Sequence, residues 1–298
     1  GFFLEGPRKK RTPARWPVPL FVLLATAAMF GQVLSQTTPN QQNAPLRLQA
    51  VRVDVALEID GRLDEEAWKN APAAGGFVQQ RPAEGQPATE RTEVRVLFDR
   101  DHLYIGVKCF DSEPDKIVVT QSRRDGTLTD TASIQVLLDT YNDDQNGFIF
   151  GTNPLGIEYD GQVAREGRTG GTTGPANRSG GGGGGGGQGT GGAQRGNITG
   201  FNLNWDAVWR VRSRIADFGW ETEIEIPFKT LRYSQRQTQT WGLNVSRNVR
   251  RKNEQTFWAP IPRSYEIYRV SMAGQLRTGD CSSAEPESDP VHFGRRPE

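Results

Sequence analysis

The sequence predicts an all-β protein: an antiparallel β-sandwich of two sheets, jelly-roll-like, with one or two short helices. Two segments show it best, residues 130–163 and residues 209–226, where apolar and polar side chains alternate with the period of a strand. Turn residues separate many such short runs along the chain, and helical periodicity is confined to short stretches. Short alternating strands with frequent turns are typical of sandwiches.

Residues 130–163 contain three expected strands. Ile134, Val136 and Leu138 alternate with a mixed face, and the polar run 139–147 then ends the strand. The second strand is the apolar run 147–152. A turn containing Pro154 leads into the third strand, because proline fixes φ there.

Residues 209–226 predict a hairpin and its register. If residues 216–219 form the loop, Ile215 lies opposite Trp220. Each arginine of the first strand then faces a glutamate of the second: Arg214 with Glu221, Arg212 with Glu223, and Arg210 with Glu225. The other face is mostly apolar, so Trp209 and Trp220 are predicted core residues. A slip of one residue would turn every charge inward.

Two further segments complete the expected core. Residues 63–68 predict a short helix that Asp64 caps, with Trp68 as a core anchor. Residues 241–249 predict a strand with Trp241, Leu243 and Val245 on one face and polar side chains on the other.

Composition excludes several function classes. The chain has 298 residues, 24% of them charged, and a net charge of +1, which gives no electrostatic case for nucleic acid. Its only two histidines are His102 and His292, so a histidine-based metal site or triad is not expected. Cys109 reads as a buried thiol in an alternating strand, and Cys281 lies in a polar tail.

The N-terminal residues have the order of a secretory signal peptide. Basic residues at 8–15 precede an apolar run at 16–30, and small side chains follow at 33–35. The expected cleavage is before Gln36. The apolar run is shorter than the ~20 residues that a membrane-spanning helix needs, which disfavours the alternative of a membrane anchor.

The expected organisation follows from these segments. Residues 1–35 are the signal peptide, 36–47 a flexible leader, and 48–276 one β-sandwich domain. A glycine-rich insertion at 167–200 interrupts that domain, and its composition predicts disorder. Residues 277–298 read as a disordered or truncated tail.

The chain resembles a known family in four long segments, which occur in the same order as in that family. They are residues 59–72, 130–163, 205–233 and 241–260. They resemble the domain related to family 9 carbohydrate-binding modules that lies at the N-terminus of large bacterial outer-membrane-associated proteins. The resemblance implies a polysaccharide or oligosaccharide ligand of plant type and residence in the periplasm or at the outer membrane. It also implies a C-terminal outer-membrane barrel region as partner, into which residues 277–298 do not continue.

Three functions are open at this point. The first is non-catalytic carbohydrate binding in polysaccharide breakdown or uptake at the bacterial envelope. The second is part of a glycoside hydrolase, since related modules occur attached to xylan-degrading enzymes. Hydrolysis of an O-glycosyl bond needs two carboxylates across that bond, and most acids here fall on strand exteriors or turns, so no catalytic residue is predicted. The third is a structural periplasmic domain of an outer-membrane barrel protein.

A sugar site needs an aromatic face and planar hydrogen-bonding groups. Trp205 and Trp258 are the tryptophans at expected loop–strand junctions, and Arg247, Arg250 and Asn253 are nearby donors. These five residues are the predicted carbohydrate site. The alternative is that both tryptophans pack the edges of the sandwich.

No metal ligand or cofactor is predicted. The run at 139–146 does place several oxygen ligands close together: Asp139, Asn142, Asp143, Asp144 and Asn146. Calcium would suit such ligands, and relatives in the family bind structural calcium, but the spacing is not that of an EF-hand. The favoured interpretation is a solvated turn.

Overall fold

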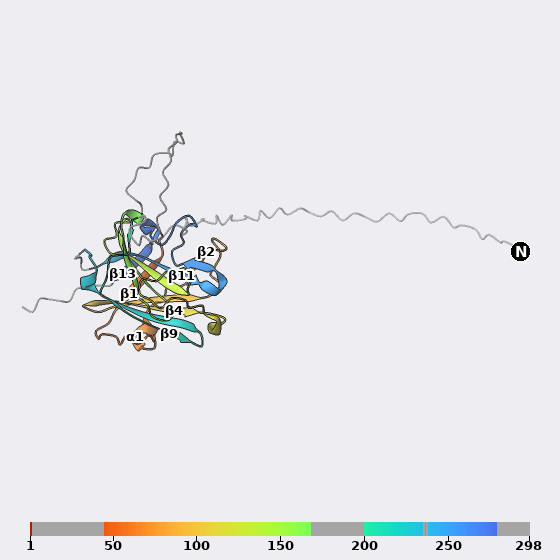
Figure 1. The fold of residues 1–298 in the computed structure, drawn as a ribbon, viewed down its shortest axis with the longest axis horizontal. Helices are drawn as coiled ribbons and strands as arrows, with labels where there is room; N and C mark the ends of the chain where they lie inside the picture. Colours follow the sequence, from red (N-terminus) through yellow and green to blue (C-terminus); the bar gives the residue numbers. More distant parts are fainter. Residues whose placement is uncertain (2–44, 168–199, 235, 237, 279–298) are drawn as a thin grey trace, which may run out of the picture. The chain divides into compact units, whose positions relative to one another are not determined.

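A computed structural model describes Gly1 and residues 45–167, 200–234, 236 and 238–278 of the chain (Figure 1). The chain divides into two compact units, residues 1–43 and 44–298, and the structural account below concerns the second. The predicted signal peptide, nearly all of the leader and of the glycine-rich insertion, and residues 279–298 lie outside the described residues. No helix in the described part is long and apolar enough to cross a membrane.

The described chain is built mainly of strands. They are β1 (Arg47–Arg52), β2 (Val78–Arg81), β3 (Thr92–Phe98), β4 (His102–Phe110), β5 (Ser133–Asp139), β6 (Gly147–Thr152), β7 (Tyr159–Val163), β8 (Phe201–Asn202), β9 (Arg210–Ala216), β10 (Gly219–Pro227), β11 (Thr240–Val249), β12 (Glu254–Phe257) and β13 (Gly274–Thr278). The helices are short: α1 (Glu66–Asn70) and the 3-10 turns η2 (Pro114–Lys116), η3 (Arg165–Gly167), η4 (Phe228–Thr230), η5 (Arg250–Lys252) and η6 (Val270–Met272).

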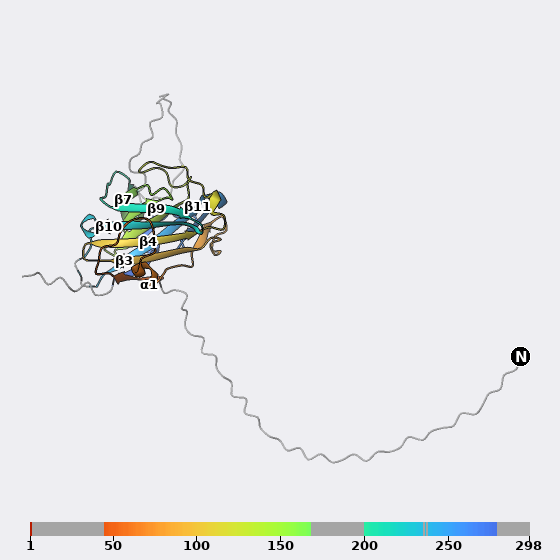
Figure 2. The same ribbon diagram turned by 90° about the horizontal axis from the view of Figure 1, so that it is seen from below.

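The strands form one continuous mixed sheet in the order β8-β7-β6-β5-β11-β13-β1-β3-β4-β10-β9, with β12 beside β11 and β2 beside β12. Strand β1 joins two halves of this sheet. Its first residues pair with β13, and Val51 and Arg52 pair with β3, both in parallel. The strands β3, β4, β10 and β9 of one half lie side by side in Figure 2.

The all-β prediction is confirmed, but the expectation of two separate antiparallel sheets is not. Because β1 leaves one half of the sheet and enters the other, the strands form one curled sheet, and the pairings of β1 are parallel. The sequence of β1 alternates like any half-buried strand and gives no sign that it changes partners.

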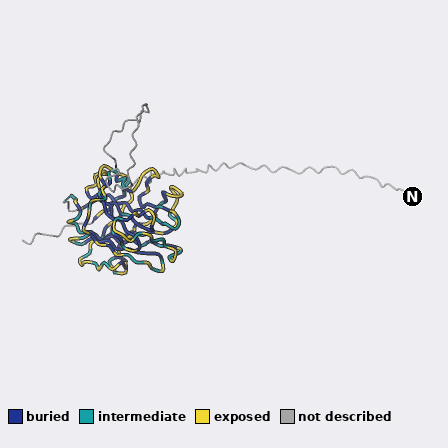
Figure 3. The backbone as a smooth tube through the Cα atoms, viewed as in Figure 1, coloured by how far each residue is buried: buried dark blue, intermediate teal, exposed yellow. Residues whose placement is uncertain are grey.

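The main core lies between the two halves and appears as the buried interior in Figure 3. Val136 of β5 and Val245 of β11 belong to one half, and Ile105 of β4 and Ile224 of β10 to the other. Two smaller apolar clusters cover the outer faces, one over β5, β6 and β7 and one between α1 and the strands β3 and β4. Both halves therefore carry loops on their outer faces.

The predicted hairpin register is confirmed in full. Ile215 lies opposite Trp220, and each of the three arginines lies opposite its expected glutamate across β9 and β10. Ion pairs join Arg210 to Glu225 and Arg214 to Glu221. Trp209 and Trp220 are core residues, as expected. The glutamates, however, are buried rather than exposed, because β10 lies between β9 and β4 and loops cover its outer face.

The short helix is present, but its expected cap is wrong. Helix α1 begins at Glu66, and its N-cap is Glu65, which makes no side-chain cap hydrogen bond. Asp64 lies one residue too early to serve. Trp68 is buried in the cluster beneath the helix, which confirms its expected role as an anchor.

One of the buried glutamates, Glu223, holds the segment before α1. Its carboxylate accepts hydrogen bonds from the backbone N–H groups of Asp60 (3.0 Å) and Gly61 (2.8 Å) and from Nε1 of Trp68 (2.9 Å). These donors favour the ionised form, but burial outweighs them and raises the pKa of Glu223 to about 7.

We expect Glu223 to make stability depend on pH. Between the ordinary pKa of 4.5 and the folded value of about 7, the folded chain holds a proton that the unfolded chain has lost. This contribution is complete below pH 4.5 and disappears as the pH rises through 7. Urea unfolding should therefore show that the wild type loses more stability between pH 5 and pH 8 than Glu223→Gln does.

Glu58→Gln, which removes an exposed acid from the same segment, is the matched control and should follow the wild type. Glu223→Ala leaves three N–H groups without their partner and should cost about 1–3 kcal/mol. Parallel stability curves for the wild type and Glu223→Gln would contradict this role.

Candidate functional site

A cleft of about 440 Å³ opens on the outer face of β5, β11 and β12. Its floor is polar and comes from three adjacent strands. In the register, Gln135 of β5 lies opposite Ser246 of β11, and Ser133 lies opposite Asn248. Asn248 in turn lies opposite Gln255 of β12. The alternation of the strands thus brings these five side chains to one surface while their neighbours in sequence point into the core.

Loops on both sides complete the cleft. The remaining lining residues are Arg81, Asp125, Thr127, Leu128, Thr129, Tyr159, Leu203, Arg250, Asn253, Glu266, Ile267 and Tyr268.

Two of the floor residues form hydrogen bonds to the loop before β5, which is one wall of the cleft. The amide of Asn248 donates hydrogen bonds to the carbonyl oxygens of Thr129 (2.9 Å) and Thr131 (2.8 Å). The hydroxyl of Ser133 donates to the carbonyl of Leu128 at 2.8 Å. These bonds fix the loop before β5 against the sheet, so this wall of the cleft is formed before any ligand binds.

The other three floor residues are uncommitted. The side chains of Gln135, Ser246 and Gln255 make no hydrogen bond to another residue in the described part of the chain. They present two planar amides and a hydroxyl to the cleft. Such groups can both donate to and accept from the hydroxyls of a ligand.

Aromatic rings form one side of the cleft. Phe201 is stacked on Tyr268 with centroids 4.5 Å apart and on Tyr159 at 6.2 Å, and the two tyrosines line the cleft. Burial raises the pKa of both tyrosines, and a hydrogen bond from the Tyr268 hydroxyl to that of Tyr159 opposes this for Tyr159. Both rings are therefore neutral at physiological pH.

The charges of the rim nearly cancel. Arg81 lies 3.7 Å from Glu266, and Arg250 lies 4.0 Å from Asp130. Asp125 lies 3.8 Å from Arg124, which also binds a group of carboxylates beside β7. A cleft with free amides, an aromatic side and paired charges suits a neutral, hydroxyl-rich ring compound better than an ion.

Of the five predicted site residues, Arg250 and Asn253 line the cleft. Trp258 does not: it is 3% exposed in the main core, so its ring has no face free for a ligand. Trp205 is half-buried and packs on Phe148 with centroids 4.9 Å apart, outside the cleft lining. For both tryptophans the structure matches the packing alternative.

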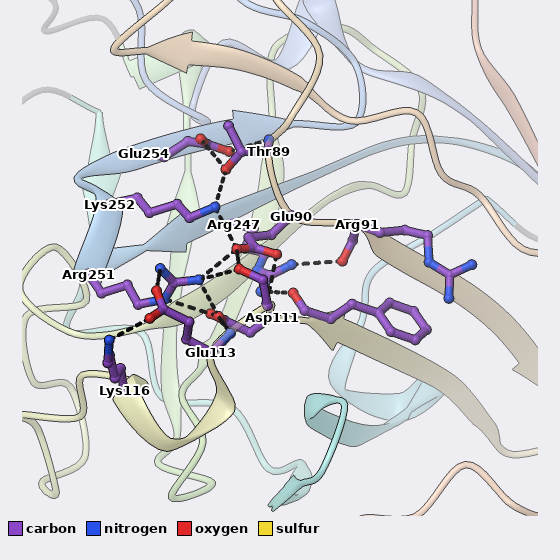
Figure 4. A network of polar contacts seen from close by, with 12 residues as sticks. Thr89, Glu90, Arg91, Asp111, Glu113, Lys116, Arg247, Arg251, Lys252 and Glu254 are labelled. Carbon is purple, nitrogen blue, oxygen red and sulfur yellow. Dashed lines mark hydrogen bonds and ion pairs between the residues drawn. The ribbon is translucent and has the colours of Figure 1, made fainter.

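Arg247 is a structural residue in the core rather than a free donor. It is 2% exposed and points between the two halves of the sheet. Its guanidinium donates to the carbonyls of Arg91 (2.8 Å; Figure 4) and Phe110 (2.7 Å) and to the hydroxyl of Thr92 (3.0 Å). Arg247 thus ties β11 to the adjoining ends of β3 and β4.

The neighbouring turn is also held by charge. Arg251 forms ion pairs with Glu90 (2.6 Å), Asp111 (2.5 Å) and Glu113 (2.7 Å), and Lys252 also reaches Glu90 (Figure 4). This network fixes η5, the turn that presents Arg250 and Asn253 to the cleft.

The acidic run after β5 is a turn that satisfies its own backbone. Asp139 accepts hydrogen bonds from the N–H groups of Asp143 (3.2 Å) and Asp144 (2.9 Å), and Asp143 accepts from those of Gln145 and Asn146. Within the described ranges, no three histidine, cysteine, aspartate or glutamate side chains are grouped to hold a metal ion.

The sequence interpretation missed Gln135, Gln255, Tyr159 and Tyr268. A signal was present, because residues 244, 246 and 248 place polar side chains at alternate positions on one face of the strand. Finding the cleft also required the pairing of β11 with β5 and β12. That pairing joins distant segments, so no local pattern reveals it.

No family model and no curated protein matches the sequence. Two solved structures of a family 9 carbohydrate-binding module from Caldicellulosiruptor kristjanssonii, in complex with glucose and with cellotriose, match it with TM-scores of 0.50 at 12% identity. The matches cover 81% and 83% of this chain and 100% and 99% of theirs. A candidate carbohydrate-binding protein from Bacteroides uniformis matches with a TM-score of 0.53 at 13% identity, over 79% of this chain and 100% of its own.

The chain has the fold of a family 9 carbohydrate-binding module. This confirms the fold that the four sequence strings imply. The CBM9-like domain corresponds to the described unit, and its cleft, rather than the two predicted tryptophans, is the candidate site.

We predict that Trp258 stabilises the fold rather than binding a ligand. Trp258→Ala should lower the free energy of unfolding by about 3–5 kcal/mol, as loss of a buried aromatic side chain does. Trp205→Ala is the comparison, because the half-buried ring loses less contact and should cost less. Urea denaturation of both variants measures this. A Trp258→Ala variant as stable as the wild type would contradict the core assignment.

Proposed function

We propose that this chain is a non-catalytic carbohydrate-binding domain and that the cleft over β5, β11 and β12 binds a neutral sugar. The observation that carries the proposal is the set of three uncommitted side chains, Gln135, Ser246 and Gln255, beside the two tyrosines that stack on Phe201. Hydroxyl groups of a pyranose ring need such planar donors and acceptors, and its apolar face needs an aromatic side.

The size of the cleft supports a short saccharide. A volume of about 440 Å³ falls at the lower end of the range for small-molecule sites, roughly 300–1,000 Å³. Solved structures with the same fold hold glucose and cellotriose. We therefore propose glucose-based oligosaccharides, or the ends of plant polysaccharides built from them, as the ligand class.

The proposal is for binding without catalysis. The two carboxylates that line the cleft, Asp125 and Glu266, each lie within 4 Å of an arginine. Glycoside hydrolysis needs a pair of carboxylates across the scissile bond, whereas both of these carboxylates are held in ion pairs. Burial outweighs the effect of Arg81 and raises the pKa of Glu266. Release of reducing sugar from cellotriose by the purified domain would favour the hydrolase alternative instead.

Calorimetric titration with cellotriose tests the site. Gln135→Ala and Gln255→Ala each remove one amide from the floor and should each weaken binding by about 0.5–1.5 kcal/mol, roughly 2- to 12-fold. Gln49→Ala, on the exposed side of β1, removes the same group far from the cleft and should bind like the wild type. Wild-type affinity in both floor variants would refute this site.

We also propose that the domain acts after export, in polysaccharide breakdown or uptake at a bacterial envelope beside an outer-membrane barrel region. The support is the order of basic, apolar and small residues within residues 1–35. Mass spectrometry of periplasmic protein should find a mature chain that begins at Gln36. Recovery of the chain with residues 1–35 intact from the membrane fraction would count against it.

A further inference from the structure

A second hollow of about 750 Å³ lies at the other end of the β5–β11 pair. The sugar cleft is beside the pairing of Ser133 with Asn248, whereas this hollow adjoins the end where Asp139 pairs with Gly242. Three chain segments line it: residues 100–102 at the turn from β3 into the start of β4, Tyr141 after β5, and residues 227–233 except Thr230. None of its lining residues also lines the sugar cleft.

The three segments are fixed to one another. The N–H of Phe228 donates to the carbonyl of Asp101 at 2.8 Å, and the hydroxyl of Thr140 donates to the carbonyl of Arg232. The hydroxyl of Thr230 donates to the carbonyl of Val208 at 2.8 Å. The hollow is therefore formed in advance and does not depend on a ligand to assemble it.

One side of the hollow is aromatic. Phe228 and Tyr233 have ring centroids 5.7 Å apart, and each contacts Trp241, at 6.3 Å and 5.7 Å. Trp241 is buried in the main core, so it anchors both rings. Tyr141 is 53% exposed at the edge of the hollow, which is unusual for a ring of this size. These rings offer apolar faces to a cyclic ligand.

The charge of the hollow is unbalanced. The exposed side chains of Arg100, Lys229 and Arg232 line it, and none of the three forms a hydrogen bond or ion pair with another residue that the structure describes. The only carboxylate in the lining is that of Asp101. Several arginines near the cleft and the β9–β10 hairpin do have acidic partners: Arg81, Arg210 and Arg214.

We propose that this hollow is a second binding site, for a saccharide that carries a carboxylate. The unpaired cations would bind the carboxylate, and the aromatic side would pack on the sugar ring. A nucleic acid fits less well, because Asp143 and Asp144 follow Tyr141 by two and three residues and would repel a phosphate backbone that extends beyond the hollow. A compact ligand with one negative charge avoids this repulsion.

A matched pair of glycosides tests the proposal: methyl β-D-glucuronide and methyl β-D-glucoside, which differ at C6 only in the carboxylate. In nuclear magnetic resonance titrations, the glucuronide should shift the signals of Tyr141 and Tyr233, and the glucoside should not. Arg100→Gln, Lys229→Gln and Arg232→Gln should each weaken glucuronide binding about 1.5- to 5-fold. The three losses multiplied should weaken binding roughly 3- to 125-fold in the triple variant.

Three controls separate this site from the rest of the protein. Arg47→Gln removes an exposed charge from β1 that has no partner among the residues the structure describes, and it should leave glucuronide binding unchanged. Gln135→Ala, in the sugar cleft, should also leave it unchanged, so failure of the proposed function and failure of this inference give different results. Raising the salt concentration should weaken glucuronide binding, because salt screens exposed charges.

Equal shifts of the Tyr141 and Tyr233 signals by the two glycosides, or wild-type glucuronide binding in the triple variant, would overturn the inference. Acetate that displaces the glucuronide at equal concentration would overturn the saccharide part, because the ring would then contribute nothing. The substituted arginine and lysine side chains are exposed and Gln135 is half-buried on the outer face of its strand, so thermal melts should show each variant folded like the wild type.

Discussion

The alternation of side chains along β5 and β11 is the constraint on which both the core and the cleft depend. Val136 and Val245 point into the core between the halves of the sheet, while Gln135 and Ser246 point to the outer face. A shift of either strand by one residue would exchange the two sets and put amides into the core. The burial of apolar side chains therefore also fixes the position of the polar floor, at no separate cost in folding energy.

Buried hydrogen bonds hold together parts of the fold that are not joined by strand pairing. Strand β1 joins the halves at one place, and Arg247 connects β11 to the ends of β3 and β4 elsewhere. Glu223 fixes the segment that covers the outer face of β10. Each of these groups would be costly to bury alone, so the carbonyls and N–H groups that they bind are as necessary as the charges themselves.

The parts predicted correctly from sequence are those set by local pattern. The register of β9 and β10 follows from one short loop and a run of alternating charges, and both were visible in residues 209–226. Trp258 was predicted to lie in the sugar site but is buried in the core. Its burial depends on β13, where Gly274 leaves room for its ring. To predict the cleft, one must know that Gln135 of β5 lies opposite Ser246 of β11. To predict a single sheet, one must know that β1 pairs with β13 and then with β3. These are contacts between distant segments, which periodicity cannot reveal.

The most direct test of the account is a crystal structure of the domain with cellotriose. We expect a glucose ring in the cleft, with its hydroxyls within hydrogen-bond distance of Gln135 and Gln255 and one face toward the stacked tyrosines. Cellotriose bound elsewhere on the domain, with the cleft filled only by water, would contradict the account.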